Sequence, residues 1–239
     1  MGNNVKESFK PRWYSVFFNP FYLIRINLYN AIKRNASFIH GCVLDFGCGS
    51  KPYVSLFNVE KYIGLDYQTD VSEKNTALAA DVFYDGNTIP FDNNFFDSVF
   101  SSEVLEHVFN PDEILEEIHR VLKPGGCLML TCPFFWPEHE QPYDYARYSS
   151  FGIQHLMQKH GFRVVKYEKT GSYFESLVQG MVLYAYYFVP HKPKFLEVII
   201  FSIFITPFLL FNMLLIKVLP KRIKRSDLYL NNIVLAEKI

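Results

Sequence analysis

The residues best placed to do chemistry stand in a short turn at residues 43–49. Apolar residues lead into Asp45, and Gly47 and Gly49 follow with one residue between them. Such an apolar run is typical of a buried parallel strand, and a glycine turn after it lets the backbone approach a ligand closely. A second acid, Asp66, closes the next apolar run, 21 residues after Asp45. A carboxylate there can bind ribose hydroxyls, so the pattern predicts a nucleotide-type ligand.

A second set of candidate residues lies in an aromatic, proline-rich loop at residues 132–148. Its side chains His139, Glu140 and Asp144 can act as a catalytic base or can orient one. For Asp144 an equally supported alternative is an ion pair with Arg147 that braces the loop. A metal site made of His139, Glu140 and Asp144 is the least favoured interpretation, so no metal is predicted.

A dinucleotide such as NAD is the first alternative for the glycine turn. The dinucleotide fingerprint G-x-G-x-x-G needs a small residue at its last position, where helix and strand pack closely. This chain has Pro52 there. The proline ring therefore disfavours a nicotinamide cofactor.

The elements that must position these residues alternate along the chain. Apolar runs predict strands at 42–46, 61–66, 77–81, 96–102, 126–132, 162–168 and 229–236. Helices are predicted at 20–40, from the N-cap Asn110 to a stop at 123–126, and from Ser149 or Ser150 to Gly161. Strands separated by helices favour an α/β fold with a parallel sheet covered on both faces.

Four blocks between residues 42 and 133 resemble, in order and spacing, the motifs of class I S-adenosylmethionine-dependent methyltransferases. They are the glycine turn, Gly64-Leu65-Asp66, Ala80-Asp81 with Ile89-Pro90-Phe91, and Phe96-Asp97-Ser98-Val99 with its continuation to Gly126. The branch that they resemble includes quinone-biosynthesis methyltransferases. The resemblance implies S-adenosyl-L-methionine as the cofactor. It also implies a doubly wound, Rossmann-like sheet of seven strands whose last strand, Leu230–Ala236, is antiparallel.

The resemblance assigns the glycine turn to the methionine part of the cofactor. The backbone of Gly47, Cys48 and Gly49 would face its carboxylate, and Asp45 would lie near its amino group. Lys51 departs from the family, which has a third glycine at that position. The role of Lys51 is left open.

The resemblance assigns later residues to the nucleoside part of the cofactor. Asp66 would accept both ribose hydroxyls, Asp81 would face the adenine amino group, and Val82 would lie beside the adenine ring. Ser102 and Glu103 would contribute backbone contacts from the end of the fourth strand. The next polar residues, Glu106 and His107, are interpreted as polar residues of a helical turn rather than as catalytic groups.

The segment before the last strand is more apolar than the fold requires. Residues 198–216 carry no charge over nineteen positions, a length that qualifies as a membrane span. Pro207 at the midpoint predicts a kink or a break in the helix, and basic residues on both sides predict that both ends stay on the cytoplasmic face. A monotopic membrane anchor is favoured, by a dip into one leaflet or by pairing with 173–189. A buried cap or homodimer interface is the alternative.

Composition and charge limit the remaining choices. The formal charge is zero, so no electrostatic field favours nucleic acid as a partner. Four cysteines without a C-x-x-C pair indicate buried thiols in a reducing compartment, and early charged residues predict no secretory signal. The predicted organisation is an N-terminal helical segment at 1–40, a cofactor-binding core at 41–171, the apolar insertion at 172–226 and the final strand at 227–239.

These features together predict a methyltransferase at the cytoplasmic face of the membrane. Its acceptor is expected to be a hydroxyl or carboxyl group of a sugar or of a lipid-linked substrate. The loop at 132–148 resembles one found in methyltransferases of surface-polysaccharide and lipid-linked sugar pathways. A quinone or prenyl-lipid methyltransferase is the alternative within the enzyme class, and a catalytically silent interaction module is the alternative outside it.

Overall fold

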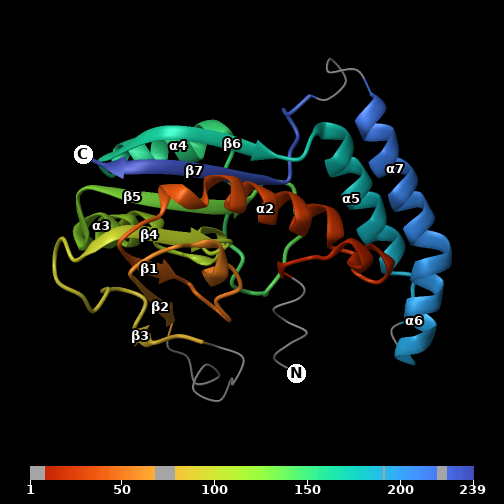
Figure 1. Ribbon diagram of the computed structural model, residues 1–239, viewed down its shortest axis with the longest axis horizontal. Coiled ribbons are helices and arrows are strands. Elements are labelled where there is room, and N and C mark those ends of the chain that lie inside the picture. The colour runs from red at the N-terminus through yellow and green to blue at the C-terminus, as the bar shows by residue number, and fades with distance from the viewer. Residues whose placement is uncertain (1–8, 68–78, 191, 220–224) are drawn as a thin grey trace.

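The computed structural model describes residues 9–67, 79–190, 192–219 and 225–239, and these form a seven-stranded sheet flanked by helices (Figure 1). The strands are β1 (Cys42–Phe46), β2 (Lys61–Tyr67), β3 (Val82–Tyr84), β4 (Phe96–Ser102), β5 (Leu122–Pro133), β6 (Phe162–Thr170) and β7 (Asn231–Lys238). Their order is β3-β2-β1-β4-β5-β7-β6. The pairs from β3 to β5 are parallel, and β7 is antiparallel to β5 and β6. The predicted α/β fold with an antiparallel last strand is confirmed.

Helices cover both faces of the sheet because neighbouring residues of each strand point to opposite sides. On one face α2 (Tyr22–Asn35) packs against the side of β1 that carries Val43. On the other face α3 (Pro111–Val121) and α4 (Ser150–Lys159) pack against the side that carries Leu44. Val43 and Leu44 are both fully buried. This burial on both sides explains why β1 is apolar apart from Asp45.

The helices begin close to their predicted starts, but they are capped differently. The Ser149 hydroxyl accepts the Gly152 N–H at 3.2 Å and caps α4 as expected. Asn110 precedes α3, but its side chain makes no capping hydrogen bond, so Pro111 is the remaining start signal. The helix predicted at 20–40 ends earlier, at Asn35, and a short 3₁₀ turn, η2 (Ala36–Phe38), follows it. Further 3₁₀ turns are η1 (Trp13–Phe17), η3 (Val54–Leu56) and η5 (Leu105–His107).

The third strand lies later in the chain than predicted. The sequence predicted a strand at 77–81, but β3 is Val82–Tyr84. Residues 77 and 78 lie outside the described residues, and 79–81 are not in a strand. The backbone at 79–81 bonds instead to the neighbouring turn and strand, since the Ala79 N–H donates to the Gly49 carbonyl at 2.7 Å and the Asp81 N–H to the Gly64 carbonyl at 2.8 Å.

A helical hairpin, residues 173–218, leaves the sheet after β6 and returns to it before β7 (Figure 1). Its first arm is α5 (Tyr173–Tyr186). Its second arm is a continuous 25-residue helix, Lys194–Val218, made of α6 (Lys194–Ile200), a π-helical turn η6 (Phe201–Ile205) and α7 (Thr206–Val218). The two arms contact each other, which is the pairing that the sequence offered as one of two arrangements.

The predicted break of this helix at Pro207 is wrong. A proline inside an α-helix removes one hydrogen-bond donor and clashes with the preceding turn. Here the π turn η6 widens the helix directly before Pro207, so the proline stands in the first turn of α7, where an N–H is not needed. The basic residues 221, 222 and 224 that entered the same argument lie outside the described residues.

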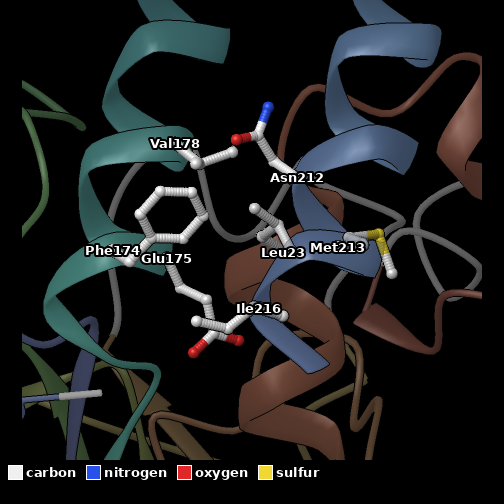
Figure 2. A pocket seen from close by; sticks show the side chains of 7 residues that line it. All are labelled: Leu23, Phe174, Glu175, Val178, Asn212, Met213 and Ile216. Atoms are coloured by element: carbon white, nitrogen blue, oxygen red, sulfur yellow. The ribbon is translucent and has the colours of Figure 1, made fainter. Parts of the chain in front are cut away.

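The hairpin packs on the rest of the protein with one face only. Figure 2 shows Phe174 and Val178 of α5 meeting Met213 of α7 and Leu23 of α2. The Gln179 side chain adds two buried hydrogen bonds, because its oxygen accepts the Ile24 N–H at 3.2 Å and its nitrogen donates to the Pro20 carbonyl at 2.8 Å. The opposite face carries exposed aromatic residues, among them Tyr184, Phe204 and Phe211, which are 68%, 70% and 64% exposed.

Candidate functional site

The glycine turn after β1 is tightly held on one side and open on the other. The Gly47 N–H and the Cys48 N–H both donate to the Leu65 carbonyl, at 2.9 and 3.1 Å. Gly47 has a φ of +70°, and a Cβ there would lie 2.4 Å from a methyl group of Val104. Gly49 has a φ of +48°, and a Cβ there would meet no atom within 4 Å. The turn therefore presents its backbone at Gly49, as close approach of a ligand requires.

Replacing Gly47 by alanine is expected to lower the free energy of unfolding by about 3 kcal/mol. The left-handed backbone would cost an alanine about 1–2 kcal/mol, and the overlap with Val104 adds about 1–3 kcal/mol. Gly125 has a similar φ of +73° but open space around its Cβ, so Gly125→Ala is the matched control, with a loss of about 1 kcal/mol. Equilibrium urea denaturation measures both values. Equal losses in the two variants would contradict the packing of Val104 on Gly47.

Asp45 lies beneath the turn with a partner that the sequence analysis missed. Its Oδ2 accepts the hydroxyl of Tyr62 at 2.7 Å. Burial raises the pKa of Asp45 to about 7, and the Tyr62 hydrogen bond and the Lys51 charge oppose that rise. The pairing of β1 with β2 explains this contact. Tyr62 pairs with Val43, which lies two residues before Asp45 and on the same face of the sheet.

Asp66 joins the end of β2 to the glycine turn. Its Oδ2 accepts the Gly49 N–H and its Oδ1 accepts the Tyr67 N–H, both at 2.8 Å. The buried thiol of Cys48 lies 3.9 Å from the same Oδ2. Burial raises the pKa of Asp66, and the charge of Glu140 adds to the rise. The carboxylate predicted to bind the ribose is therefore in direct contact with the glycine turn, and Glu140 is close enough to Asp66 to raise its pKa.

The structure shows a contact for Lys51, whose role the sequence left open. Its ammonium group forms an ion pair with Asp81, whose Oδ2 also accepts the Gly64 N–H at 2.7 Å. Burial acts to raise the pKa of Asp81, but Lys51 and the Gly64 N–H outweigh it and lower that pKa below its usual value. Val82 follows in β3, opposite Leu65. Lys51, which replaces the third glycine of the family, therefore links Asp81 to the glycine turn.

The end of β4 is held by hydrogen bonds within the protein. The hydroxyls of Ser102 and Thr131 lie 2.9 Å apart. Glu103, with a φ of +57°, accepts the Thr131 hydroxyl on Oε1 and the Asn231 side-chain amide on Oε2, both at 2.8 Å. Burial raises the pKa of Glu103. Both of its carboxylate oxygens are thus engaged by strands β5 and β7, and Thr131 and Asn231 are further residues that the sequence analysis missed.

The loop residues His139 and Asp144 form a pair, and Arg147 supports it. The Nδ1 of His139 lies 3.0 Å from Asp144 Oδ2, and the His139 backbone N–H donates to the same oxygen at 2.9 Å. Arg147 binds both carboxylate oxygens, at 2.5 and 2.6 Å, and lowers the pKa of Asp144 well below its usual value. Asp144 therefore has the contacts of a brace and of a histidine-orienting carboxylate at once. Glu140, 75% exposed at its side chain, lies beside this pair.

Glu106 and His107, which follow β4, connect to the His139–Asp144 pair. The backbone N–H groups of Tyr145 and Ala146 donate to the Glu106 carbonyl at 2.8 and 3.3 Å, which fixes the loop against the strand end. The Nε2 atoms of His107 and His139 lie 3.2 Å apart. Glu106 and His107 lie in the helical turn η5, as expected from the sequence, and this turn brings His107 to His139 and buries Glu106 completely.

The arrangement fits in part the cofactor that the motifs imply. S-adenosyl-L-methionine needs backbone groups for its carboxylate and a carboxylate for its ribose hydroxyls. The space around Gly49 is open, but its N–H donates to Asp66, and the N–H groups of Gly47 and Cys48 donate to Leu65, so the carboxylate contacts expected from these three residues are occupied within the protein. The polar loop that carries His139 and Glu140 is near Asp66, because the charge of Glu140 raises the pKa of Asp66.

The methyltransferase-domain family model matches residues 44–130. The chain is 37% identical over 90 residues to the mitochondrial arginine-hydroxylase NDUFAF5 of Homo sapiens, a match that covers 35% of this chain and 26% of that protein. It is 34% identical over 121 residues to sterol 24-C-methyltransferase of Pneumocystis carinii, with 41% of this chain and 31% of that protein covered. The chain thus spans about a quarter to a third of the length of these curated relatives.

A solved structure of similar fold is phosphoethanolamine N-methyltransferase 2 of Haemonchus contortus in complex with S-adenosyl-L-methionine. The TM-score is 0.52 at 20% identity, and the match covers 89% of this chain and 52% of that one. This likeness covers most of the chain, whereas the family match ends within β5. The predicted cofactor, S-adenosyl-L-methionine, is confirmed for the part of the chain that matches a methyltransferase domain, residues 44–130, and the likeness to the solved structure shows that the chain shares its fold.

Proposed function

We propose that the protein transfers a methyl group from S-adenosyl-L-methionine to a hydroxyl group, or a carboxyl group, of a sugar or lipid-linked acceptor at the cytoplasmic face of a membrane. The observation that carries the proposal is the hydrogen bond from the Gly49 N–H to Asp66, together with the His139–Asp144 pair in the loop whose Glu140 raises the pKa of Asp66. Residues 41–171 would form the cofactor-binding core and 172–226 the membrane-contacting insertion. A hydroxyl acceptor is favoured over a carboxyl acceptor. At neutral pH a carboxyl group has already lost its proton, whereas a hydroxyl group must still lose one and therefore uses a base such as His139.

When bound, the cofactor supplies a methyl group on a sulfonium: the acceptor oxygen forms the new C–O bond while the C–S bond breaks and sulfur keeps the electron pair. The hydroxyl proton must leave in the same process, and His139 is the nearest suitable base. Its Nδ1–H donates to Asp144, so Nε2 carries a lone pair. Burial and the neighbouring His107 lower the pKa of His139, which keeps it unprotonated at neutral pH.

The proposal is tested by calorimetric titration with S-adenosyl-L-methionine, followed by transfer of a labelled methyl group to fractionated membrane extracts. We expect binding at a single site and label in a glycolipid fraction. A chain that does not bind the cofactor would overturn the proposal and favour a silent interaction module. Label in the quinone fraction alone would favour the prenyl-lipid alternative, which has the exposed apolar hairpin and the sterol-methylating relative in its support.

The hairpin supports action at a membrane surface. Among the described residues, Lys194–Val218 is the helix that is long and apolar enough to cross a bilayer, and it is about 38 Å long at 1.5 Å per residue. A crossing is disfavoured because Phe201, Ile205 and Leu209 are buried against the protein. The exposed face can instead lie in the head-group region, with Lys194 and Lys217 near anionic lipids.

Charged substitutions on the outer face of the hairpin are expected to release the protein from vesicles. The double variant Phe204→Glu with Phe211→Glu removes two exposed aromatic side chains, each worth about 1.5–3 kcal/mol when buried in lipid, so partitioning should fall at least about 100-fold. Flotation with anionic vesicles measures it. Phe151→Glu on α4, at a residue that is 84% exposed and outside the hairpin, is the matched control. Wild-type protein that stays with the soluble fraction would contradict membrane contact.

A further inference from the structure

Three side chains that can bind a metal ion meet beside the proposed cofactor site. They are Glu106, His107 and His139, whose ligand atoms all lie within 4.8 Å of one another. The two Nε2 atoms are 3.2 Å apart, and Glu106 Oε1 lies 3.7 Å from His107 Nε2. Two of these residues come from the turn after β4 and the third from the loop after β5. The cluster is therefore fixed by two elements that hydrogen-bond to each other through the Glu106 carbonyl.

The hydrogen bonds of the two imidazoles determine where their protons are. His107 Nδ1 lies 2.7 Å from the Tyr143 carbonyl oxygen, which can only accept. His139 Nδ1 lies 3.0 Å from the carboxylate of Asp144, which also accepts. Both rings thus carry their proton on Nδ1, and both Nε2 lone pairs point at the same space. Metal-binding histidines are oriented in this way, with the second ring nitrogen donating to a carbonyl or carboxylate.

The environment of the Glu106 side chain is a second and independent observation that points to a bound ion. Its side chain is fully buried, and among the described residues neither carboxylate oxygen has a hydrogen-bond partner. A buried polar group without a partner is costly unless something else satisfies it. A cation placed between Glu106 and the two imidazoles would satisfy these two oxygens.

A proton shared between the two histidines would account for fewer of these contacts than a metal ion does. A proton would join the two Nε2 atoms but would leave both Glu106 oxygens unsatisfied. Burial, His107 and the Arg147 guanidinium also act against a positive charge on His139. A divalent ion instead engages all three groups. Four-coordinate Zn²⁺ at about 2.0–2.1 Å from each nitrogen would separate two ligands by about 3.3 Å, close to the 3.2 Å between the two nitrogens.

We propose that Glu106, His107 and His139 bind a divalent transition-metal ion, with Zn²⁺ as the best match. Two imidazoles and one carboxylate form a ligand set that catalytic zinc sites use, with a further position left for water or substrate. Asp144 and the Tyr143 carbonyl would serve as positioning groups for the two rings. Glu140, whose Oε2 lies 4.0 Å from His107 Nε2, stands at the exposed side of the cluster.

The role of the ion in methyl transfer rests on the proposed function. The acceptor hydroxyl would occupy the free coordination position, where the ion lowers the pKa of the hydroxyl. The Nε2 lone pair of His139 would then be engaged with the metal, so the hydroxyl proton would leave through the exposed carboxylate of Glu140 rather than to His139. Metal binding itself does not depend on this role.

Metal binding to the EDTA-treated full chain tests the proposal directly. We expect about one Zn²⁺ per chain by equilibrium dialysis and elemental analysis, and visible d–d absorption bands with Co²⁺. Glu106→Gln keeps the shape of the side chain and should fold, but it should lose at least about 100-fold in metal affinity, more than the loss of an outer partner usually costs. His155→Ala removes an exposed histidine of α4 and should bind as wild type does.

The outcomes separate this proposal from the proposed function. Wild-type protein that binds neither Zn²⁺ nor Co²⁺, or Glu106→Gln that binds as tightly as wild type, would overturn the metal site. In that case calorimetric binding of S-adenosyl-L-methionine in EDTA would leave the methyltransferase proposal standing. Metal binding without cofactor binding would support the site and contradict the methyltransferase.

Discussion

Asp66→Ala is expected to weaken binding of S-adenosyl-L-methionine by at least about 100-fold. The carboxylate would accept two ribose hydroxyls, and each hydrogen bond to a charged acceptor is worth about 1.5–3 kcal/mol, so about 3 kcal/mol is lost at the minimum. The variant also frees the Gly49 N–H, which now donates to Asp66 at 2.8 Å. The glycine turn would then be less well ordered for the cofactor carboxylate. Calorimetric titration of the folded variant measures the effect.

Asp92→Ala is the matched control, because Asp92 is an exposed acid between β3 and β4 and has no place in the site. Its dissociation constant should equal that of wild type. If Asp66→Ala binds the cofactor within threefold of wild type, the ribose contact assigned to Asp66 is wrong. The glycine turn would then have to bind the cofactor without it.

His139→Ala is expected to lower turnover on the true acceptor by about 100- to 10,000-fold, the range that a positioned acid–base group contributes. Binding of S-adenosyl-L-methionine should change less than threefold, because Asp66 and the glycine turn remain intact. The ordinary pKa of histidine is about 6.5, and burial together with His107 lowers that of His139. A base with a lowered pKa stays unprotonated to lower pH, so wild-type turnover should hold below pH 6.5 before it falls.

Chelation separates the two roles of His139. If the residue is a base only, EDTA leaves turnover unchanged; if it is a metal ligand, EDTA removes turnover and Zn²⁺ restores it. His155→Ala is again the control and should retain wild-type turnover. Full turnover of His139→Ala would show that neither role is correct and would leave His139 as part of a brace with Asp144 and Arg147.

Most of the fold follows from patterns that act within a few residues. The apolar run before Asp45 and the cap at Ser149 placed β1 and α4 correctly, because strand alternation and helix capping are local effects. Two errors have non-local causes. Residues 79–81 bond to Gly49 and Gly64, which are distant in sequence, and so β3 starts later. Pro207 does not break its helix because a π turn before it changes the register, and no residue pattern announces that turn.

The site was predictable where one residue type performs one task. The contact of the glycine turn with Asp66 is made by the Gly49 N–H, and the cofactor contacts assigned to these residues stay a prediction. Glu106 and His107 lie in a helical turn as predicted, but the burial of Glu106 was not predicted, because a polar pair after a strand is usually solvated. Only the return of a loop more than thirty residues later turns that pair inward, toward His139. The role of Lys51 also needed coordinates, since its partner Asp81 is thirty residues away.

The hairpin and the candidate site share one edge of the sheet. Thr170 ends β6 just before α5, its hydroxyl donates to the Asn231 side chain at 3.0 Å, and Asn231 donates to Glu103 at the end of β4. A bilayer that holds the hairpin would therefore hold the reaction centre at a fixed height above the lipid. An acceptor anchored in that bilayer would arrive by lateral diffusion, so the initial rate should follow its mole fraction in the lipid rather than its bulk concentration.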